Sequence, residues 1–482
     1  MGYNTTLSFH GGVGTVTGAN FLLEGERTKV LVDCGLIQGE RYAHDMNRES
    51  FPYTAASIDF LLVTHAHIDH VGRIPKLVRD GFTGKIISTP ETLELARLML
   101  PDAFSVLRME MPEGEEPFYD EKDIQKAFSL WETKPLHTTF SVGEFEVTTK
   151  DSGHILGSVM FEISLNKGST PTSESEGGLY NPRPETGTPF TKGDRRRSII
   201  FTGDLGNHPT PLLKPAESIA GATYLVMESV YGDRNHEGGG MRKERLSEVI
   251  RATVEKKGVL LIPCFSLEKT QVLLSEMDEL FEDKNLFDIP VFLDSPLAIK
   301  VTEVYRRYAG TLNSDMQARL RKDDDIFSFK NLRLTMDRQA SSEIERERSP
   351  KIIIAGSGMS AGGRILEHER RYLGDPNNTI LFIGYQAIGG LGRQIQEGVK
   401  HIHINHEEVT VRARIETITG YSSHMDGDHL LEFAEKGAET LEKVFVVMGE
   451  PKAALFLAQR IKDYGGIETM VPVAGESVEI EL

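Results

Sequence analysis

The sequence predicts an α/β protein in which a doubly wound parallel α/β domain follows a strand-rich first domain. Its 482 residues are too many for one ordinary hydrophobic core, so two or three domains are expected. Short apolar runs separated by glycine-rich turns open the chain, whereas continuous apolar strands alternate with amphipathic helices from about residue 222. Near residue 400 the alternating pattern returns.

The first domain begins with residues 1–32, where three short apolar runs predict a meander of β-strands. Apolar residues at helical spacing predict a helix over 91–110. Strands are expected again at 144–150 and 199–201. Between them, residues 166–197 are rich in Gly, Pro, Ser and Thr, which predicts a long surface excursion.

The second domain alternates strands and helices, a pattern typical of a parallel sheet covered on both faces. Its strands are expected at 224–227, 259–262, 291–293, 352–355 and 380–383, and its helices near 242–257, 268–282, 297–309 and 363–373. After the alternating strands near 400, a helix is expected from about 427 and a strand at 444–447.

Composition favours a soluble cytoplasmic protein without contact to a membrane. Hydrophobic residues make up 39% of the chain and charged residues 26%, and no apolar run approaches the roughly 18 residues that span a bilayer. The N-terminus lacks the features of a signal peptide, and two cysteines argue against a disulfide framework. The net charge of −18 does not exclude a nucleic-acid substrate, because bound metal and a local basic cleft can carry that contact.

The stretch 61–72, LLVTHAHIDHVG, predicts a metal site. Three histidines and an aspartate follow a buried strand, and imidazole and carboxylate are ligands for zinc and related ions. Spacing of two places His65 and His67 on one side of an extended segment. Asp69 and His70 lie past a bend and can face a second ion. The alternative is a structural histidine cluster.

Three further residues follow expected strands and can complete this site. His154 can complete the ligand set that His65 and His67 begin. Asp204 can bridge two ions, and Asp33 can orient a ligand from outside the metal shell.

A glycine-rich loop at 356–364 follows a strand and opens a helix. Backbone amides at such a position suit phosphate, so Ser357 and Gly358 are candidate substrate contacts. Arg364 and Arg393 could add positive charge. The spacing does not match a dinucleotide fingerprint, and a plain tight turn is the alternative.

These motifs resemble a known family. The metal ligands His65, His67, Asp69, His70, His154 and Asp204, preceded by Asp33, resemble the four successive motifs of the metallo-β-lactamase fold. The stretches 228–233 (ESVYGD), 294–298 (DSPLA), 356–359 (GSGM) and 384–386 (GYQ) resemble the β-CASP nucleases, which include bacterial ribonuclease J and the cleavage subunit of pre-mRNA 3′-end processing. The resemblance implies a metallo-β-lactamase αββα sandwich at 1–209 and 407–482, with a β-CASP domain inserted at 210–406.

The resemblance also implies a function. A zinc-dependent phosphodiesterase is expected, which hydrolyses single-stranded RNA internally, from an end, or both, by attack of a zinc-bound hydroxide on phosphorus. Two zinc ions and a homodimer are further expectations from the resemblance. A nuclease that acts on single-stranded or damaged DNA is the first alternative.

Two residues match the family's acid–base motifs. Glu228 matches motif A, and His424 matches motif B, where a histidine paired with the carboxylate is the proposed general acid for the leaving oxygen. An adjacent carboxylate keeps an imidazole charged near neutral pH. With these two, the candidate catalytic residues are Asp33, Asp69, Glu228 and His424.

One position departs from the family pattern. Motif C is usually a histidine before Gly-Glu, but here Met448 stands at that position. A thioether is a poor ligand for hard or borderline dications. Three outcomes follow: the second ion binds more weakly, a water fills the gap, or one zinc suffices. A catalytically impaired scaffold subunit is the remaining alternative.

Overall fold

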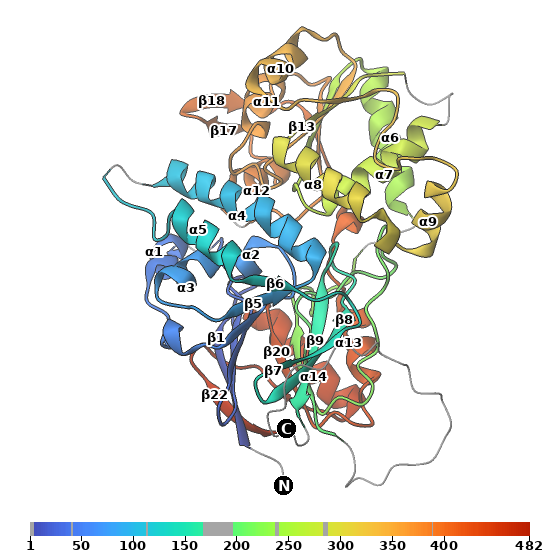
Figure 1. The fold of residues 1–482 in the computed structure, drawn as a ribbon. Coiled ribbons are helices and arrows are strands. Elements are labelled where there is room, and N and C mark those ends of the chain that lie inside the picture. Colours follow the sequence, from blue (N-terminus) through green and yellow to red (C-terminus); the bar gives the residue numbers. More distant parts are fainter. Residues whose placement is uncertain are drawn as a thin grey trace. The chain divides into compact units, whose positions relative to one another are not determined.

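The computed structural model describes residues 4–39, 42–111, 114–166, 196–236, 241–282, 288–387 and 389–482. The surface excursion predicted at 166–197 therefore lies outside the described residues, apart from its ends. The chain divides into two compact units (Figure 1). The first unit comprises Met1–His208, Pro215–Asn235 and His424–Leu482, and the second unit comprises Pro209–Lys214 and His236–Ser423.

The described part of the first unit contains two seven-stranded sheets. In spatial order, the first sheet is β22 (Ser477–Glu481), β1 (Asn4–Gly11), β2 (Asn20–Glu24), β3 (Lys29–Val32), β4 (Phe60–Leu62), β5 (Lys85–Ser88) and β6 (Trp131–Thr133). The second sheet is β21 (Glu468–Met470), β20 (Lys443–Val447), β11 (Tyr224–Glu228), β10 (Ile199–Phe201), β9 (Val159–Leu165), β8 (Phe145–Asp151) and β7 (Thr139–Val142). Both sheets mix parallel and antiparallel pairs.

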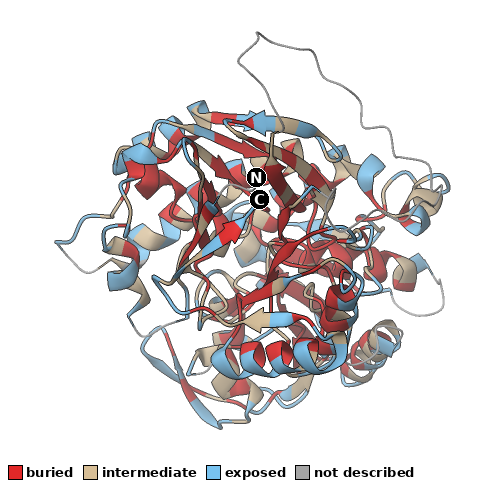
Figure 2. Cartoon of the chain, turned by 90° about the horizontal axis from the view of Figure 1, so that it is seen from below, coloured by how far each residue is buried: buried red, intermediate tan, exposed pale blue. Residues whose placement is uncertain are grey.

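The two sheets pack face to face. The ring centroids of Phe9 and Phe445 lie 5.4 Å apart, and those of Phe21 and Phe201 lie 6.3 Å apart. Because side chains alternate along a strand, Phe21 of β2 joins this inner core while its neighbour Leu22 packs on the opposite face. The strands are mostly buried, whereas the helices show buried residues on one side and exposed residues on the other (Figure 2).

Helices cover both outer faces. The first sheet carries α2 (Ile68–Val71), α3 (Ile74–Arg79), α4 (Pro90–Glu110) and α5 (Glu121–Ser129), and the second carries α13 (Gly427–Glu435) and α14 (Pro451–Gly465). A short helix, α1 (Ala43–Arg48), follows β3. The first unit is therefore the predicted αββα sandwich, and α4 confirms the helix expected at 91–110.

The second unit is built on one parallel sheet within the described residues. In spatial order its strands are β14 (Leu332–Leu334), β13 (Val291–Asp294), β15 (Lys351–Ala355), β12 (Val259–Pro263), β16 (Thr379–Phe382) and β19 (Arg414–Thr417). Its helices are α6 (Arg242–Glu255), α7 (Lys269–Glu282), α8 (Pro296–Arg307), α9 (Ser314–Leu320), α10 (Arg338–Glu343), α11 (Ile365–Tyr372) and α12 (Leu391–Gln396). Every residue of β12 and β15 is buried, as expected for strands covered on both faces.

The units divide at places that differ from the predicted boundaries of 1–209, 210–406 and 407–482. Strand β11 falls within the predicted second domain, but it lies between β10 and β20 in the first unit. The hairpin of β17 (His401–Ile404) and β18 (Glu407–Thr410) and strand β19 belong to the second unit, which the chain leaves only at His424. The apolar residues of β19 alternate with polar ones, which did not predict that β19 extends the parallel sheet by pairing with β16.

Among the described residues, no helix is both long and apolar enough to cross a membrane.

Candidate metal centre and active site

One edge of the first unit gathers the ends of several strands. Strand β3 leads to Asp33, β4 leads to His65 through Thr64, and β10 leads to Asp204. His154 lies in the turn between β8 and β9. Parallel β3 and β4, in register at Val32 and Leu62, bring their two polar ends side by side.

Four predicted ligands converge on one point. His67 Nδ1 lies 3.1 Å from Nε2 of His65 and 3.1 Å from Nε2 of His154. Asp204 Oδ2 lies 3.4 Å from each of those two Nε2 atoms. A tetrahedral zinc with bonds of about 2.0–2.1 Å separates its ligand atoms by about 3.3–3.4 Å. The donor set and its spacing therefore fit a tetrahedral zinc ion.

The protonation states suit metal binding. Burial lowers the pKa of His67 and of His154 well below the usual value, which leaves neutral imidazoles whose lone pairs are available. Asp204 is buried, but the facing His70 and the hydrogen bond from His65 hold its pKa well below the usual range. The cluster thus offers three neutral nitrogens and one carboxylate oxygen.

A second position lies beside the first. His70 Nε2 and Asp204 Oδ1 are buried 3.3 Å apart, and neither has a hydrogen-bond partner among the described residues. These two buried atoms would suit a second cation as ligands. Among the described residues, no group of neighbouring potential metal ligands includes Asp69, so its place at the second position stays a prediction. Burial raises the pKa of its carboxyl group.

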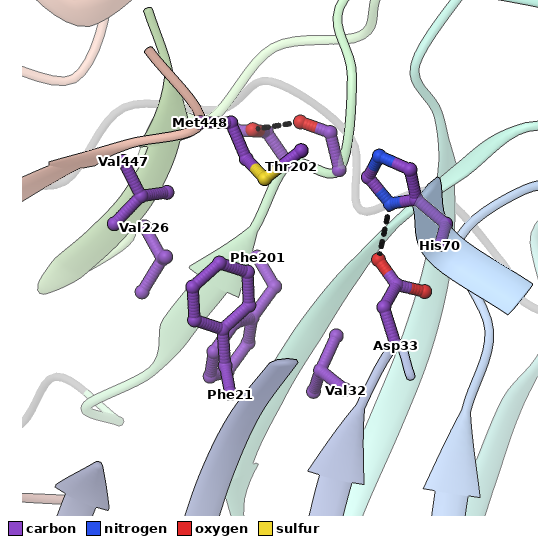
Figure 3. A pocket seen from close by; sticks show the side chains of 10 residues that line it. Phe21, Val32, Asp33, His70, Phe201, Thr202, Val226, Val447 and Met448 are labelled. Carbon is purple, nitrogen blue, oxygen red and sulfur yellow. Dashed lines mark hydrogen bonds and ion pairs between the residues drawn. The ribbon is translucent and has the colours of Figure 1, made fainter. Parts of the chain in front are cut away.

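Asp33 contacts the Nδ1 side of the His70 ring, the orienting position predicted for it. Its Oδ2 accepts a hydrogen bond of 2.8 Å from His70 Nδ1, so Nε2 is left for a metal (Figure 3). Burial opposes charge on His70, yet the carboxylates of Asp204 and Asp33 hold its pKa well above the usual value. Asp33 itself accepts from the backbone N–H and the hydroxyl of Thr64, each at 2.8 Å.

Met448 occupies the motif C position next to this pair. It has a left-handed backbone with φ of 48°, its N–H donates to Gly12 O at 2.6 Å, and its side chain is buried. A cavity of about 10 Å³, room for one water, is lined by Met448, His70 and Asp33 (Figure 3). A Cβ on Gly12 would lie 2.4 Å from the Met448 sulfur, so the thioether packs against the glycine backbone.

Glu228 and His424 lie together at the same edge. His424 Nδ1 is 3.2 Å from Glu228 Oε1, and its ring centroid is 4.6 Å from that of His154. Glu228 is fully buried and accepts hydrogen bonds from the N–H groups of Leu205 and Val230. Burial raises its pKa, although the facing His424 opposes this. The predicted acid–base pair therefore adjoins the four-ligand cluster.

Comparison with known proteins agrees with this geometry. Three family models match in succession: the metallo-beta-lactamase superfamily at 13–155, the Beta-Casp domain at 270–395, and the Zn-dependent metallo-hydrolase RNA specificity domain at 408–472. Ribonuclease TTHA0252 of Thermus thermophilus is 31% identical over 472 residues, which are 96% of this chain and 97% of that protein. The chain belongs to the β-CASP family of the metallo-β-lactamase superfamily.

Other β-CASP relatives cover a similar share of the chain. The transcription termination factor FttA of Methanosarcina mazei is 28% identical over 98% of this chain and 71% of its own length. That of Thermococcus kodakarensis is 30% identical over 96% and 69%. A crystal structure of a protein of unknown function from Enterococcus faecalis V583 covers 99% of this chain and all of its own with a TM-score of 0.54 and 12% identity, which shows the shared fold alone.

The predicted substrate contacts all lie in the second unit, which contains the match to the β-CASP domain. Ser357 and Gly358 lie in the loop after β15, where the Ser357 hydroxyl accepts from Ala361 N–H. Arg364 donates to Asp294 and to two backbone carbonyls. Arg393 forms an exposed pair with Glu397. The arginines are therefore engaged within the protein, and their contact with substrate stays a prediction.

Sequence reasoning missed Thr64. Its hydroxyl donates to Asp33 and lies 3.0 Å from His65 Nδ1, so it links the outer carboxylate to a metal ligand. The one signal in the sequence is its place between the strand and His65, which any buried threonine could occupy.

Proposed function

We propose that this β-CASP protein is a zinc-dependent ribonuclease that hydrolyses single-stranded RNA. The observation that supports this most is the convergence of His65, His67, His154 and Asp204 beside the pair of His424 and Glu228. A relative named a ribonuclease across nearly the whole chain and the match to an RNA specificity domain support RNA as the substrate.

The chain's own residues have distinct tasks in this reaction. Bound zinc would supply a nucleophile from water near neutral pH and neutralise charge on the phosphoryl group. His424 donates a proton to the oxygen that leaves phosphorus, and Glu228 orients the ring by accepting at Nδ1. Asp33 and Thr64 hold His70 in the tautomer that presents Nε2 to the second position.

We further propose two zinc ions of unequal affinity. His65, His67, His154 and Asp204 would hold the first ion with four protein ligands. The second would have Asp69, His70 and the other oxygen of Asp204, without the histidine that usually completes motif C. A thioether contributes little to zinc. The weaker second ion follows from this loss.

For substrate binding we propose the loop that carries Ser357 and Gly358. Backbone amides after a parallel strand favour a phosphate, and Arg393 is exposed enough to leave Glu397 for RNA. Homodimerisation and a cytoplasmic location are proposed on the family resemblance and composition alone, and sedimentation and cell fractionation test them.

One experiment tests the function. The purified protein, with zinc content measured, is incubated with a 5′-labelled single-stranded RNA and with the DNA of the same sequence. We expect cleavage of RNA that chelator abolishes and added zinc restores. Preferential DNA cleavage would support the alternative substrate, and no cleavage of either strand by the zinc-loaded protein would refute the proposal. The pattern of labelled products separates internal cutting from trimming.

A further inference from the structure

The turn after strand β11 is attached to the segment that carries His424, and both belong to the first unit. Tyr231 forms an isolated parallel bridge with Asp426, and Gly427 N–H donates to Arg234 O at 3.0 Å. Arg234 N–H donates to Tyr231 O at 3.1 Å, which closes the turn. A Cβ on Gly427 would lie 3.0 Å from Tyr231 O, so a larger residue would crowd this contact. The backbone of Arg234 is therefore fixed beside the segment of the proposed general acid.

The side chain of Arg234 lies over an aromatic ring that adjoins His424. Its guanidinium carbon is 5.0 Å from the centroid of the Tyr231 ring, and that centroid is 6.1 Å from the centroid of the His424 ring. A guanidinium on an aromatic face is held in place while the N–H groups at its rim can still donate to another molecule. The stack thus places a positive charge at the edge of the first unit that carries the candidate metal ligands.

The N–H groups of the Arg234 side chain are not used within the described residues. The side chain donates no hydrogen bond to them, and its one ion pair there is a long one, with Asp233 Oδ1 at 3.9 Å from Nε. The side chain is also 50% exposed. By contrast, Arg197 in the same unit donates to both oxygens of Glu442. A guanidinium that is held by stacking and has unused donors is preorganised for an anion with several oxygens, such as a phosphate.

A second cation lies on the other oxygen of the same carboxylate. The Lys452 side chain is 86% exposed, and its Nζ lies 3.2 Å from Asp233 Oδ2. Lys452 is the second residue of α14, so it belongs to the first unit as well. Arg234, Asp233 and Lys452 together carry one net positive charge. This local charge favours a polyanion although the whole chain has a net charge of −18.

We propose that Arg234 binds a phosphate of the RNA backbone other than the one that is cleaved. This inference rests on the proposed function, in which zinc and His424 act on the cleaved phosphate. Because that phosphate is held by those groups, a guanidinium stacked on Tyr231 meets another phosphate of the same strand. Such a contact fixes the position of the strand without reading its bases. It therefore favours a polymer over a substrate with a single phosphate.

The test compares a polymer with a substrate that has one phosphate. Wild type, Arg234→Gln and Arg234→Lys are assayed on single-stranded RNA over a series of salt concentrations and on bis(p-nitrophenyl) phosphate, with zinc content measured for each. We expect Arg234→Gln to raise KM for RNA about tenfold, because a charged hydrogen-bond donor is lost, and to affect the single diester less. The slope of log(1/KM) for RNA against log[salt] should become shallower by about 0.7, the share of one phosphate contact in a single strand. Arg234→Lys keeps the charge and should keep the wild-type slope.

Arg108→Gln is the matched control. Arg108 on α4 is exposed, its guanidinium carbon lies 5.9 Å from the centroid of the Phe104 ring, and it forms no ion pair with the described residues. The variant therefore removes the same charge and the same kind of stack from the same unit. Because α4 carries no predicted site residue, we expect Arg108→Gln to keep the wild-type KM and salt slope for RNA.

Three results would overturn the inference. The first is RNA cleavage by Arg234→Gln with the KM and the salt slope of wild type. The second is an equal loss on RNA and on the single diester at normal zinc content, which would mean that Arg234 does not bind a separate phosphate. The third is a rise in KM for Arg108→Gln as large as that for Arg234→Gln, which would reflect net charge alone. If zinc-loaded wild type cleaves no RNA, the proposed function fails instead.

Discussion

Replacing Met448 by histidine should create a tight second zinc site. Nε2 of His70 and Oδ1 of Asp204 face each other at 3.3 Å without hydrogen-bond partners in the described chain, and with Asp69 they are the three ligands proposed for this position. Met448 lines the small cavity that also contacts His70. An imidazole there would add the nitrogen ligand that zinc prefers to a thioether.

The gain in zinc affinity at the second position can be estimated. Residues that only orient a ligand change metal affinity about ten- to a hundredfold. A direct ligand should therefore give at least about a hundredfold, or about 2.7 kcal/mol. The backbone favours the change as well, because histidine tolerates the left-handed region better than methionine does, and φ is 48° at this position.

The assay is zinc content by mass spectrometry after dialysis against a graded series of chelator concentrations. We expect wild type to fall from two ions to one at low chelator and Met448→His to keep both. Met448→Leu, which preserves volume without a ligand, should behave as wild type. Equal retention of two ions by wild type and Met448→His would refute the argument, and so would a histidine variant that still binds only one.

Three further predictions follow from the same geometry. His154→Ala should remove one of four ligands from the first ion and abolish RNA cleavage, with zinc content as the direct measurement. Asp33→Ala should weaken the second ion about ten- to a hundredfold, because His70 loses its 2.8 Å hydrogen bond, and the chelator series would show it. Asp294→Ala should cost about 3 kcal/mol in urea unfolding at pH 7, because Arg364 loses its buried partner. Hydrogen bonds hold the pKa of Asp294 at about 2 despite burial, against about 3.9 when unfolded, so this difference should persist above pH 4 and shrink as pH falls towards 2.

The convergence of His65, His67, His154 and Asp204 could be predicted because it depends on local spacing and on strand ends. The sequence His-x-His-x-Asp-His places ligands on both sides of one bend, and the structure brings His65 and His67 to one ion position and His70 to the other. The place of Asp204 beside these histidines was predictable because it follows a buried strand, and its role as a bridge between two ions stays a prediction. The αββα sandwich itself depended on the family resemblance, since alternation alone does not say which strands face each other.

Contacts between distant parts of the chain could not be predicted. Tyr421 and Glu276 are 145 residues apart, and although Tyr421 opens the stretch that resembles motif B, nothing in the sequence marks Glu276 as its partner. The glycine-rich loop suggested that Arg364 adds positive charge for a phosphate, but Arg364 donates to Asp294, which lies 70 residues away in the sequence. For the same reason, the sequence did not predict that the chain re-enters the first unit only at His424. That boundary depends on the pairing of β19 with β16 at the edge of the second unit's sheet.

Three residues that follow strands at the edge with the candidate metal ligands have left-handed backbone conformations. The structural reason for that conformation differs among the three. Asp33 has φ of 60° and uses the turn to direct its carboxylate at His70. Gly203 has φ of 53°, and a Cβ there would lie 2.7 Å from Thr64. Met448 adopts φ of 48°, and its side chain makes no polar contact with the described residues that would offset the roughly 1–2 kcal/mol this conformation costs. Histidine tolerates this backbone conformation better than methionine does and would add a nitrogen ligand, which is why a single substitution should suffice to complete the proposed second site.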